Sequence, residues 1–246
     1  MRILVKNGTW AQAASFSEAL ASRIMVSTKI AVVGSGGKTS IIMHLAEEQK
    51  ALGKKVLVLT TTHMYTPEQY GIFSGLAADV KNALRTNGIA IVGKETDGGK
   101  ITWPGDELYS EIKRMADIIL IEADGSKRLP LKLPNESEPV ILPETDIILA
   151  VSGLSAIGRQ GNEACHRWSL ARATLDISDE NEILRPEHLS LFMKEAYLNP
   201  MQKEFPSAFI IPIFNQADDE ALSEIGKKII DELKPEVGIV SSMLPL

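Results

Sequence analysis

The stretch Ala31-Val32-Val33-Gly34-Ser35-Gly36-Gly37-Lys38-Thr39-Ser40 decides the fold of this chain. A mainly apolar run, Lys29 to Val33, leads directly into a glycine-rich turn, and Ile41 to Lys50 then has the pattern of a helix. A phosphate-binding loop requires this order, because glycines let backbone N–H groups point at phosphate oxygens and a helix N-terminus adds further donors. In such a loop Lys38 reaches the β- and γ-phosphates, and the Thr39 hydroxyl ligates Mg²⁺.

The loop is shorter than the standard form G-x-x-x-x-G-K-[ST], which would place a glycine at position 32, where valine stands. The form that fits is G-x-x-G-K-[ST], which begins at Gly34 and resembles the ATP-binding loops of Mur-type ligases. Two fewer residues mean fewer backbone amides around the phosphates. A glycine turn with a chance Lys-Thr pair is the alternative. The expected nucleotide-binding residues of the loop are Gly34, Ser35, Gly36, Gly37, Lys38, Thr39 and Ser40.

Composition favours one α/β domain over residues 1–246. The chain is 44% hydrophobic and 24% charged, which is enough for a sizeable core. Its formal charge of −6 argues against nucleic acid or an anionic membrane as the main partner. The single cysteine, Cys165, excludes an internal disulfide and is typical of a reducing cytoplasm. No apolar run approaches the length of a membrane span, so we expect a cytoplasmic protein.

A second apolar strand, Val56 to Thr60, follows the helix, and this strand–helix–strand order predicts a parallel pair. It ends in Thr60-Thr61-Thr62-His63-Met64. Ligands of open α/β sheets lie beyond the carboxyl ends of the strands. We therefore expect Thr61 and Thr62 to face phosphate or a second substrate, and His63 to position an attacking water. The alternative is that threonine simply suits strands and that His63 caps the turn.

The next buried strand, Asp117 to Ile121, ends in Glu122-Ala123-Asp124-Gly125. In nucleotide-hydrolysing P-loop proteins an acidic residue at this place holds Mg²⁺ through water, and a glycine three positions later offers its N–H to the γ-phosphate. Glu122 and Gly125 fit these two roles, and a glutamate here resembles the metallochaperone class of GTPases. Asp124 is a second candidate for the metal or the attacking water. An ordinary strand-to-turn exit is the alternative.

Two further groups of polar residues are candidates for an anionic second substrate. Residues 126–134 follow the predicted γ-phosphate sensor and could act as a switch segment, and Lys127 and Arg128 lie within it. A solvated loop is the alternative. His166 and Arg167 follow the cysteine and could also face an anionic ligand. The thiol itself is expected to be buried.

A third motif follows the apolar run Ala208 to Phe214. It reads Asn215-Gln216-Ala217-Asp218, where GTPases have Asn-Lys-x-Asp. In that motif the aspartate accepts two hydrogen bonds from guanine, a pairing that adenine cannot make. Here Gln216 replaces the lysine that stacks on the base, so the identity of the base stays open. Asn215, Asp218 and Ser241, which follows the final predicted strand, are the expected base-binding residues; a common Asn/Asp turn is the alternative.

The remaining pattern predicts a three-layer α/β/α domain of the P-loop NTPase class with a mostly parallel sheet. We expect an amphipathic helix from Trp10 to Arg23, an inserted β-ribbon over 88–103 and a helical excursion over 152–206. Asp97-Gly98 between two apolar runs is the hairpin signal in the ribbon. Within the helical excursion, Pro186 stands at the start of a helical pattern, where proline is common, and so indicates the beginning of a helix.

Taken together, these motifs resemble the YqeC family, which is regarded as accessory to selenium-dependent molybdenum hydroxylases and is also described as selenium cofactor biosynthesis proteins. The resemblance covers about residues 16–243. It implies a nucleotide-dependent role in the maturation of such an enzyme or its cofactor. The stretches that carry it are Val33 to Thr39, Thr60 to Met64, Glu122 to Leu131, His166-Arg167 and Asn215 to Asp218.

Three hypotheses of function follow. The first is a slow Mg²⁺-dependent NTPase, with GTP favoured over ATP, that acts as an assembly factor for a molybdenum hydroxylase. Its expected catalytic residues are Lys38, Glu122, Asp124 and His63, with Thr39 and Glu122 at the metal. The second is an ATP-dependent small-molecule kinase or ligase, and the third is a non-hydrolysing, nucleotide-regulated metallochaperone. GTPases of the metallochaperone class often pair face to face, so a homodimer is also open.

Overall fold

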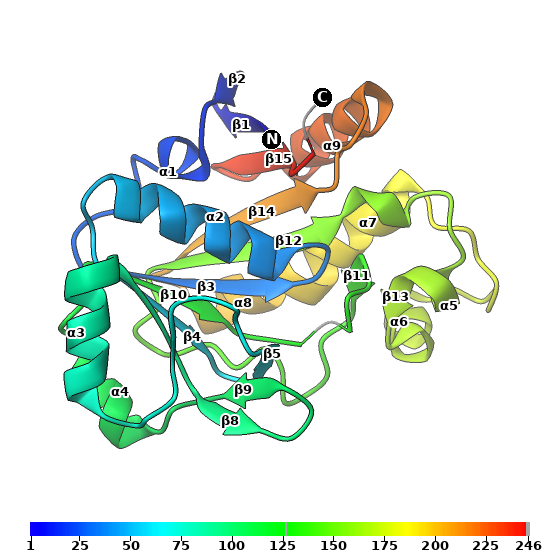
Figure 1. The fold of residues 1–246 in the computed structure, drawn as a ribbon. Coiled ribbons are helices and arrows are strands. Elements are labelled where there is room, and N and C mark those ends of the chain that lie inside the picture. Colours follow the sequence, from blue (N-terminus) through cyan, green and yellow to red (C-terminus); the bar gives the residue numbers. More distant parts are fainter. Residues whose placement is uncertain (126, 245–246) are drawn as a thin grey trace.

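A mostly parallel β-sheet forms the centre of the computed structural model, which describes residues 1–125 and 127–244. Within those residues the sheet has ten strands in the order β2-β1-β15-β14-β12-β3-β10-β4-β7-β6. Figure 1 shows the parallel strands fanning out beneath α2. The strand that leads into the glycine loop, β3, lies between β10 and β12 in the middle of the sheet. The parallel strands are β3 (Thr28–Gly34), β4 (Val56–Thr60), β6 (Gly71–Ile72), β7 (Ile89–Val92), β10 (Ile118–Glu122), β12 (Ile147–Gly153), β14 (Phe209–Asn215) and β15 (Gly238–Ser242).

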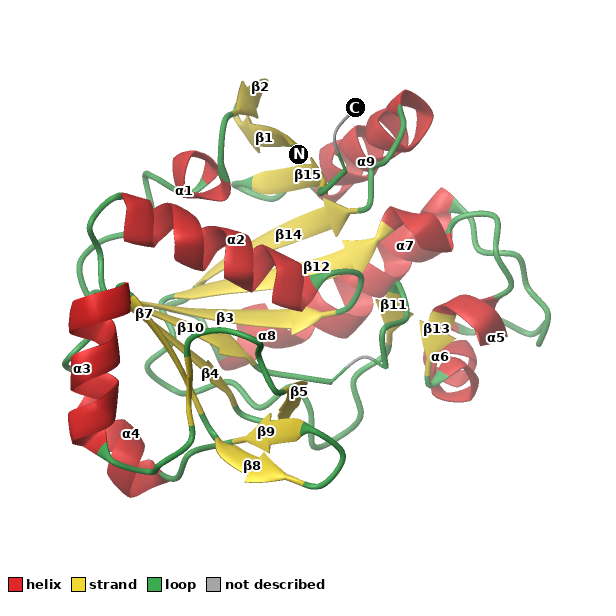
Figure 2. Ribbon diagram, in the orientation of Figure 1, coloured by secondary structure: helices red, strands yellow, loops and turns green. Residues whose placement is uncertain are grey.

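Helices cover both faces of the sheet, because successive side chains of a strand point to opposite faces. On β3, Ile30 and Val32 pack with the first two helices, whereas Ala31 and Val33 pack with helices from the second half of the chain. Figure 2 shows α2 on one side of the sheet and α8 on the other. The predicted three-layer α/β/α fold is thereby confirmed. Its helices are α1 (Phe16–Ala19), α2 (Lys38–Ala51), α3 (Ala77–Asn87), α4 (Asp106–Ile112), α6 (Trp168–Leu175), α7 (Pro186–Phe192), α8 (Asn199–Glu204) and α9 (Glu220–Leu233).

The N-terminal segment differs from the prediction of one helix over Trp10–Arg23. It forms a hairpin of β1 (Arg2–Asn7) and β2 (Thr9–Ala13), and only α1 is helical. β1 pairs antiparallel with β15 over five register positions, so the hairpin extends the sheet at this edge. Residues 10–13 pair with β1 in this hairpin, and these backbone hydrogen bonds outweigh a weak local helix preference.

The predicted ribbon over 88–103 also needs correction. Its first strand, β7, belongs to the main sheet and runs parallel to β4. All four residues of β7 are buried, as expected for a strand of a parallel sheet with both faces covered. The ribbon itself consists of β8 (Lys94–Thr96) and β9 (Lys100–Thr102), and β5 (His63–Tyr65) pairs antiparallel with β9. The residues that follow β4, His63 to Tyr65, are therefore fixed by backbone hydrogen bonds to the ribbon.

The segment between β12 and β14 is mainly helical. It contains a short 3₁₀ turn (Leu154–Ala156), α5 (Gly161–Ala164), β13 (Cys165–His166), α6 and then α7 and α8 joined by a π-helical turn (Met193–Leu198). β13 pairs in parallel with β11 (Leu131–Lys132), and α6 begins after it at Trp168, so this part of the predicted helical excursion is a strand. This pairing attaches the segment that follows β10 to the helical segment.

Candidate nucleotide-binding site

The glycine loop curls tightly over the carboxyl end of β3. Gly34, Gly36 and Gly37 have φ angles of +91°, +84° and +117°, which residues with a side chain rarely adopt. The backbone of β12 also passes close beneath the loop: a Cβ on Gly34 would lie 2.1 Å from the oxygen of Val151, and one on Gly36 would lie 2.4 Å from the nitrogen of Gly153. Glycine is therefore required for both conformation and space.

Lys38 begins α2 and folds back over the loop. Its Nζ donates to the Gly34 carbonyl oxygen at 2.6 Å and lies 3.1 Å from Asp124 Oδ1. The other oxygen of Asp124 accepts from the Gly34 N–H at 3.0 Å. Both side chains are buried, at 2% and 0% exposure. Asp124, predicted to bind metal or water, thus lies beneath the loop, where it neutralises Lys38.

Thr39 and Glu122 meet at the open side of the loop. The Thr39 hydroxyl donates to Glu122 Oε2 at 2.7 Å, and the Thr60 hydroxyl donates to the Glu122 carbonyl oxygen. The parallel pairing of β10 with β3 and β4 brings these three residues together. Burial raises the pKa of Glu122, and the nearby Lys38 charge and the Thr39 hydrogen bond only partly oppose this shift. Glu122 is therefore a buried carboxyl group that a cation would stabilise in its ionised form.

A second buried lysine, Lys132, lies on the other side of Asp124. Its Nζ is 3.5 Å from Asp124 Oδ2 and 2.7 Å from Glu138 Oε2, and it also donates to the Gly125 carbonyl oxygen. Arg167 Nη1 lies 2.7 Å from the same Glu138 oxygen. The side chain of Lys132 is fully buried. These charges connect the loop after β10 with the start of α6.

A cleft of about 760 Å³ opens beside the loop, at the carboxyl edge of the sheet. It extends from the loop and the N-terminus of α2 to the ribbon. No side chain of the described residues caps the start of α2, so its first N–H groups remain available at this edge. The predicted site residues that line the cleft are Gly36, Gly37, Lys38, Thr39, Ser40, His63, Glu122, Gly125, Lys127, Arg128 and His166.

Other predicted second-substrate residues make internal contacts. The Thr61 hydroxyl donates to the Val140 carbonyl oxygen at 2.7 Å, and Arg167 is held by Glu138 and the Leu133 carbonyl oxygen. Thr62 lies at the base of the ribbon, where its carbonyl oxygen accepts from Thr102. None of these three predicted residues lines the cleft, whereas their sequence neighbours His63 and His166 do.

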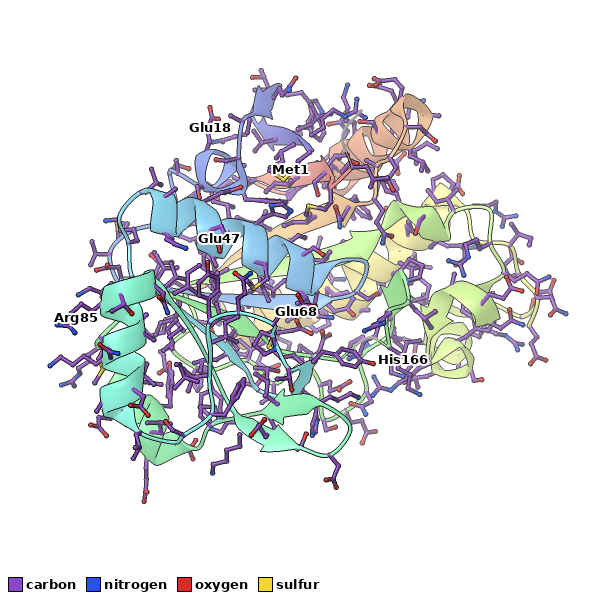
Figure 3. All side chains as sticks on the ribbon, in the orientation of Figure 1. Met1, Glu18, Glu47, Glu68, Arg85 and His166 are labelled. Atoms are coloured by element: carbon purple, nitrogen blue, oxygen red, sulfur yellow. The ribbon has the colours of Figure 1, made fainter. Side chains whose placement is uncertain are left out.

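His166 lies between α6 and the sheet edge, as Figure 3 shows, and its backbone pairs with β11. Its Nδ1 is buried and has no hydrogen-bond partner among the described residues. Burial lowers the pKa of His166, and the charges of Arg167, Lys127 and Lys132 lower it further. The imidazole is therefore neutral at neutral pH and lies in a region of positive potential.

The predicted base-binding residues lie on the opposite side of the loop, after β14 and β15. Asn215 is buried and braces the loop: its Nδ2 donates to the Gly36 carbonyl oxygen at 2.7 Å, and its Oδ1 accepts from the Ser241 hydroxyl. Asp218 is exposed, and its Oδ1 accepts from the Ser242 hydroxyl at 2.6 Å. Gln216 lines the cleft next to Gly153. Asn215 and Ser241 thus support the loop, whereas Asp218 faces solvent.

Sequence reasoning did not single out three residues near the cleft. Lys100 and Tyr65 line it from the ribbon, and Glu138 joins the buried lysine to Arg167. The pairing of β5 with β9 brings the first two together across 35 positions of sequence, and no local pattern indicates it. Lys132 lies between two apolar residues, Leu131 and Leu133, and this position in an apolar stretch was a sequence signal of a buried lysine paired with a carboxylate such as Glu138.

The glycine loop between β3 and α2, with Lys38 and Thr39 facing an acidic residue on the neighbouring strand, defines a P-loop NTPase-like domain. The chain belongs to the YqeC family, whose model, described as YqeC protein, matches residues 30–169. It is 36% identical over 173 residues to a protein of Escherichia coli (strain K12) described as "Uncharacterized protein YqeC", covering 64% of this chain and 68% of that protein.

Among solved structures, the crystal structure of FtsY from Mycoplasma mycoides matches with a TM-score of 0.38 and 15% identity. The match covers 85% of this chain and 58% of that one, so the chain spans less than two thirds of the length of this structure. In the described part of the chain, no helix combines the length and apolar character that crossing a membrane requires.

Proposed function

We propose that this protein binds a nucleoside triphosphate with Mg²⁺ at the glycine loop and hydrolyses it slowly. The observation that carries the proposal is the position of Lys38, whose Nζ is held between Asp124 and the Gly34 carbonyl oxygen of the glycine loop. Its ammonium group can exchange these partners for phosphate oxygens by a small side-chain movement. The cost of that exchange is reduced because the phosphate is itself an anionic partner for Lys38 and because Asp124 keeps Lys132 at 3.5 Å.

The loop offers several donors to the phosphates. The uncapped N–H groups at the start of α2 and the amides of Gly36 and Gly37, which line the cleft, can bind phosphate oxygens. The Ser35 hydroxyl is buried and has no hydrogen-bond partner among the described residues, so a phosphate oxygen would satisfy it. A triphosphate chain therefore fits the donors that this loop presents.

Thr39 and Glu122 fit a magnesium ion. Hydroxyl and carboxylate oxygens are hard ligands of the kind that Mg²⁺ prefers, and the two side chains are already within hydrogen-bond distance. When bound, Mg²⁺ would neutralise charge on the β- and γ-phosphates. His63 is exposed at the edge of the cleft and is the side chain that could orient a water molecule there. Asp124 would act by positioning Lys38.

We propose GTP as the favoured nucleotide, because the third motif presents an exposed carboxylate, that of Asp218, after β14 on the side of the loop away from Glu122. The family membership supports a role in maturing a selenium-dependent molybdenum hydroxylase or its cofactor, which is proposed from that resemblance alone. A second candidate function is phosphoryl transfer from ATP to a small acceptor. The cations Lys127 and Arg128 in the cleft favour this second candidate.

Calorimetric titration tests the proposal. Purified protein is titrated with non-hydrolysable GTP and ATP analogues in the presence of Mg²⁺, and the Lys38→Ala variant is titrated in parallel. We expect binding by the wild type and a loss of at least about tenfold in affinity in the variant, because a charge-assisted phosphate contact disappears. Equal affinity in a folded Lys38→Ala protein would exclude the loop as the phosphate site. Lys81→Ala, an exposed lysine on α3, is the control.

A further inference from the structure

The cleft continues beyond the place where the nucleotide would end. Thr39 and Glu122 lie on the β10 side of β3, so the terminal phosphate and its metal belong on that side. The nucleoside then leaves towards β12 and β14, where Gln216 lies over Gly153. The ribbon lies in the other direction, next to β4. Its end of the cleft, here called the ribbon end, is formed by Tyr65, Lys100, Lys127, Arg128 and His166.

The ribbon end is positively charged, although the chain as a whole carries a formal charge of −6. Within the described residues, Lys100, Lys127 and Arg128 form no ion pair with a carboxylate. The carboxylates that line the cleft are committed elsewhere: Glu138 pairs with Lys132 and Arg167, and Glu122 accepts from Thr39. Three cations therefore face one space without internal neutralisation, which is the electrostatic condition for binding an anion.

Two of these cations, Lys100 on β9 and Arg128 in the segment after β10, lie over one ring. The Arg128 guanidinium lies 4.4 Å from the centre of the Tyr65 ring, and Lys100 Nζ lies 5.4 Å from it. Tyr65 is 54% exposed, so the ring is an open platform. Lys127 and Arg128 both adopt the left-handed backbone conformation, with φ of 49° and 61°. Such strained residues are concentrated at ligand-binding segments.

We propose that the ribbon end binds a second ligand, a small molecule that carries a phosphate group, beside the terminal phosphate of the nucleotide. The planar guanidinium of Arg128 matches two phosphate oxygens, and Lys100 supplies a point charge from the facing wall. The Nδ1 of His166, on β13, is buried without a hydrogen-bond partner among the described residues and adds a polar group to the lining of the cleft. The orientation of this ligand rests on the proposed nucleotide site, but its binding residues do not overlap with the loop.

Calorimetry with phenyl phosphate tests the proposal. The protein is first saturated with Mg²⁺ and the non-hydrolysable triphosphate analogue that binds it, and phenyl phosphate is then titrated. We expect binding that weakens at least about tenfold in Lys100→Ala and in Arg128→Ala, since each removes a charged phosphate contact. Lys81→Ala should bind like the wild type. Affinity for the triphosphate analogue should stay within about twofold in both ribbon-end variants.

Three results would overturn the proposal. One is a dissociation constant for phenyl phosphate above about 10 mM in the saturated wild type, or a dissociation constant that is the same in the wild type and in both variants. Another is an equal loss of triphosphate affinity in the variants, which would show that the nucleoside itself occupies the ribbon end. The third is equally tight binding of benzoate, which would indicate a carboxylate site.

The same titration separates failure of this proposal from failure of the nucleotide site. If no triphosphate analogue binds, phenyl phosphate is titrated into the free wild type and into Lys38→Ala. Binding that survives Lys38→Ala and is lost in Arg128→Ala supports the ribbon end and rejects the nucleotide site. Binding lost in Lys38→Ala and kept in Arg128→Ala places the phosphate on the loop and overturns the ribbon-end proposal.

Discussion

Asp124 is the residue on which the arrangement of the loop depends most, because its buried carboxylate faces two buried lysines. We expect Asp124→Asn to lower the free energy of unfolding by about 3 kcal/mol, since removing one partner of a buried ion pair leaves the other charge uncompensated. Lys132 keeps Glu138 as a partner, whereas Lys38 keeps the Gly34 carbonyl oxygen and the nearby charge of Glu122. Urea unfolding followed by circular dichroism measures the change.

Asp97→Asn is the matched control for this variant, because Asp97 is an exposed aspartate in the turn between β8 and β9. Its substitution should change the free energy of unfolding by less than about 0.5 kcal/mol. If both variants unfolded at the same urea concentration, the buried pair would contribute nothing to stability. The positioning role given to Asp124 would then be wrong.

Glu138 makes stability depend on pH. Burial raises its pKa, but the hydrogen bonds and charges of Lys132 and Arg167 lower it by more, so that the net shift is downward. The ionised carboxylate therefore favours the folded state above its ordinary pKa, and this stabilisation is lost as the pH falls through the folded-state pKa. We expect Glu138→Gln to cost about 2 kcal/mol near pH 7, since Lys132 and Arg167 lose a shared partner.

The stability difference between wild type and Glu138→Gln should narrow as the pH falls from the ordinary glutamate pKa, about 4.3, through the lower pKa of Glu138 in the folded protein. Urea unfolding at a series of pH values measures it. Glu136→Gln, in the same segment but exposed, should follow the wild type at each pH. A difference that stayed constant down to the lowest pH would mean that the charge of Glu138 is not what stabilises the fold.

At the level of whole elements, the close approach of β12 determines which residues fit in the turn between β3 and α2. Gly36 and Gly99 both have positive φ angles, but a Cβ would meet the Gly153 backbone at 2.4 Å only in the first case, and nothing within 4 Å in the second. We expect Gly99→Ala to cost about 1 kcal/mol through backbone strain alone. Gly36→Ala should cost at least about 2 kcal/mol more, since the backbone of β12 must also move.

Thermal unfolding of the two glycine variants measures this difference, and titration with the triphosphate analogue shows whether the loop still binds. Gly36→Ala should lose binding, and Gly99→Ala should keep it. Equal destabilisation would mean that the loop can move away from β12 at little cost. In that case the close approach would not explain why glycine stands at this position.

The elements that the sequence predicted best are those with strong local signals. The buried strands β4 and β10 follow from apolar runs, and the helix predicted over Ile41 to Lys50 lies within α2. The N-terminal hairpin and the membership of β7 in the main sheet depend on partners far along the chain, β15 and β4. Residues 10–13 pair with β1 across a tight turn at Gly8, so their helical prediction was wrong because this nearby strand pairing outweighs their helix preference.

On the scale of the molecule, the site was predictable as far as chain topology determines it. Parallel strands bring the loop, Glu122 and the residues after β4 to one edge, so that His63, Thr39 and Glu122 were expected there and are found there. Side-chain direction was not predictable, because it depends on packing between distant segments. Asp124 turns beneath the loop towards two lysines, and Arg167 turns to Glu138 instead of the cleft.

The proposed base site lies on the β14 side of the loop, where β14 and β15 end at the carboxyl edge of the sheet. Asp218 lies there, exposed, with one oxygen held by the Ser242 hydroxyl. If this carboxylate reads guanine, it accepts two N–H groups of the base, and Asp218→Asn replaces one acceptor with a donor. The variant should therefore lose at least about tenfold in affinity for the GTP analogue, with little change for the ATP analogue.

Xanthosine triphosphate makes the test of Asp218 sharper, because xanthine has a carbonyl oxygen where guanine has an amino group. An asparagine amide can donate to that oxygen, so Asp218→Asn should gain affinity for the xanthosine analogue while it loses affinity for the GTP analogue. Asp219→Asn, which changes the neighbouring N-cap of α9, controls for local disturbance. Unchanged preferences in Asp218→Asn would mean that the base is read elsewhere, and an ATP preference in the wild type would favour transfer to an acceptor in the cleft.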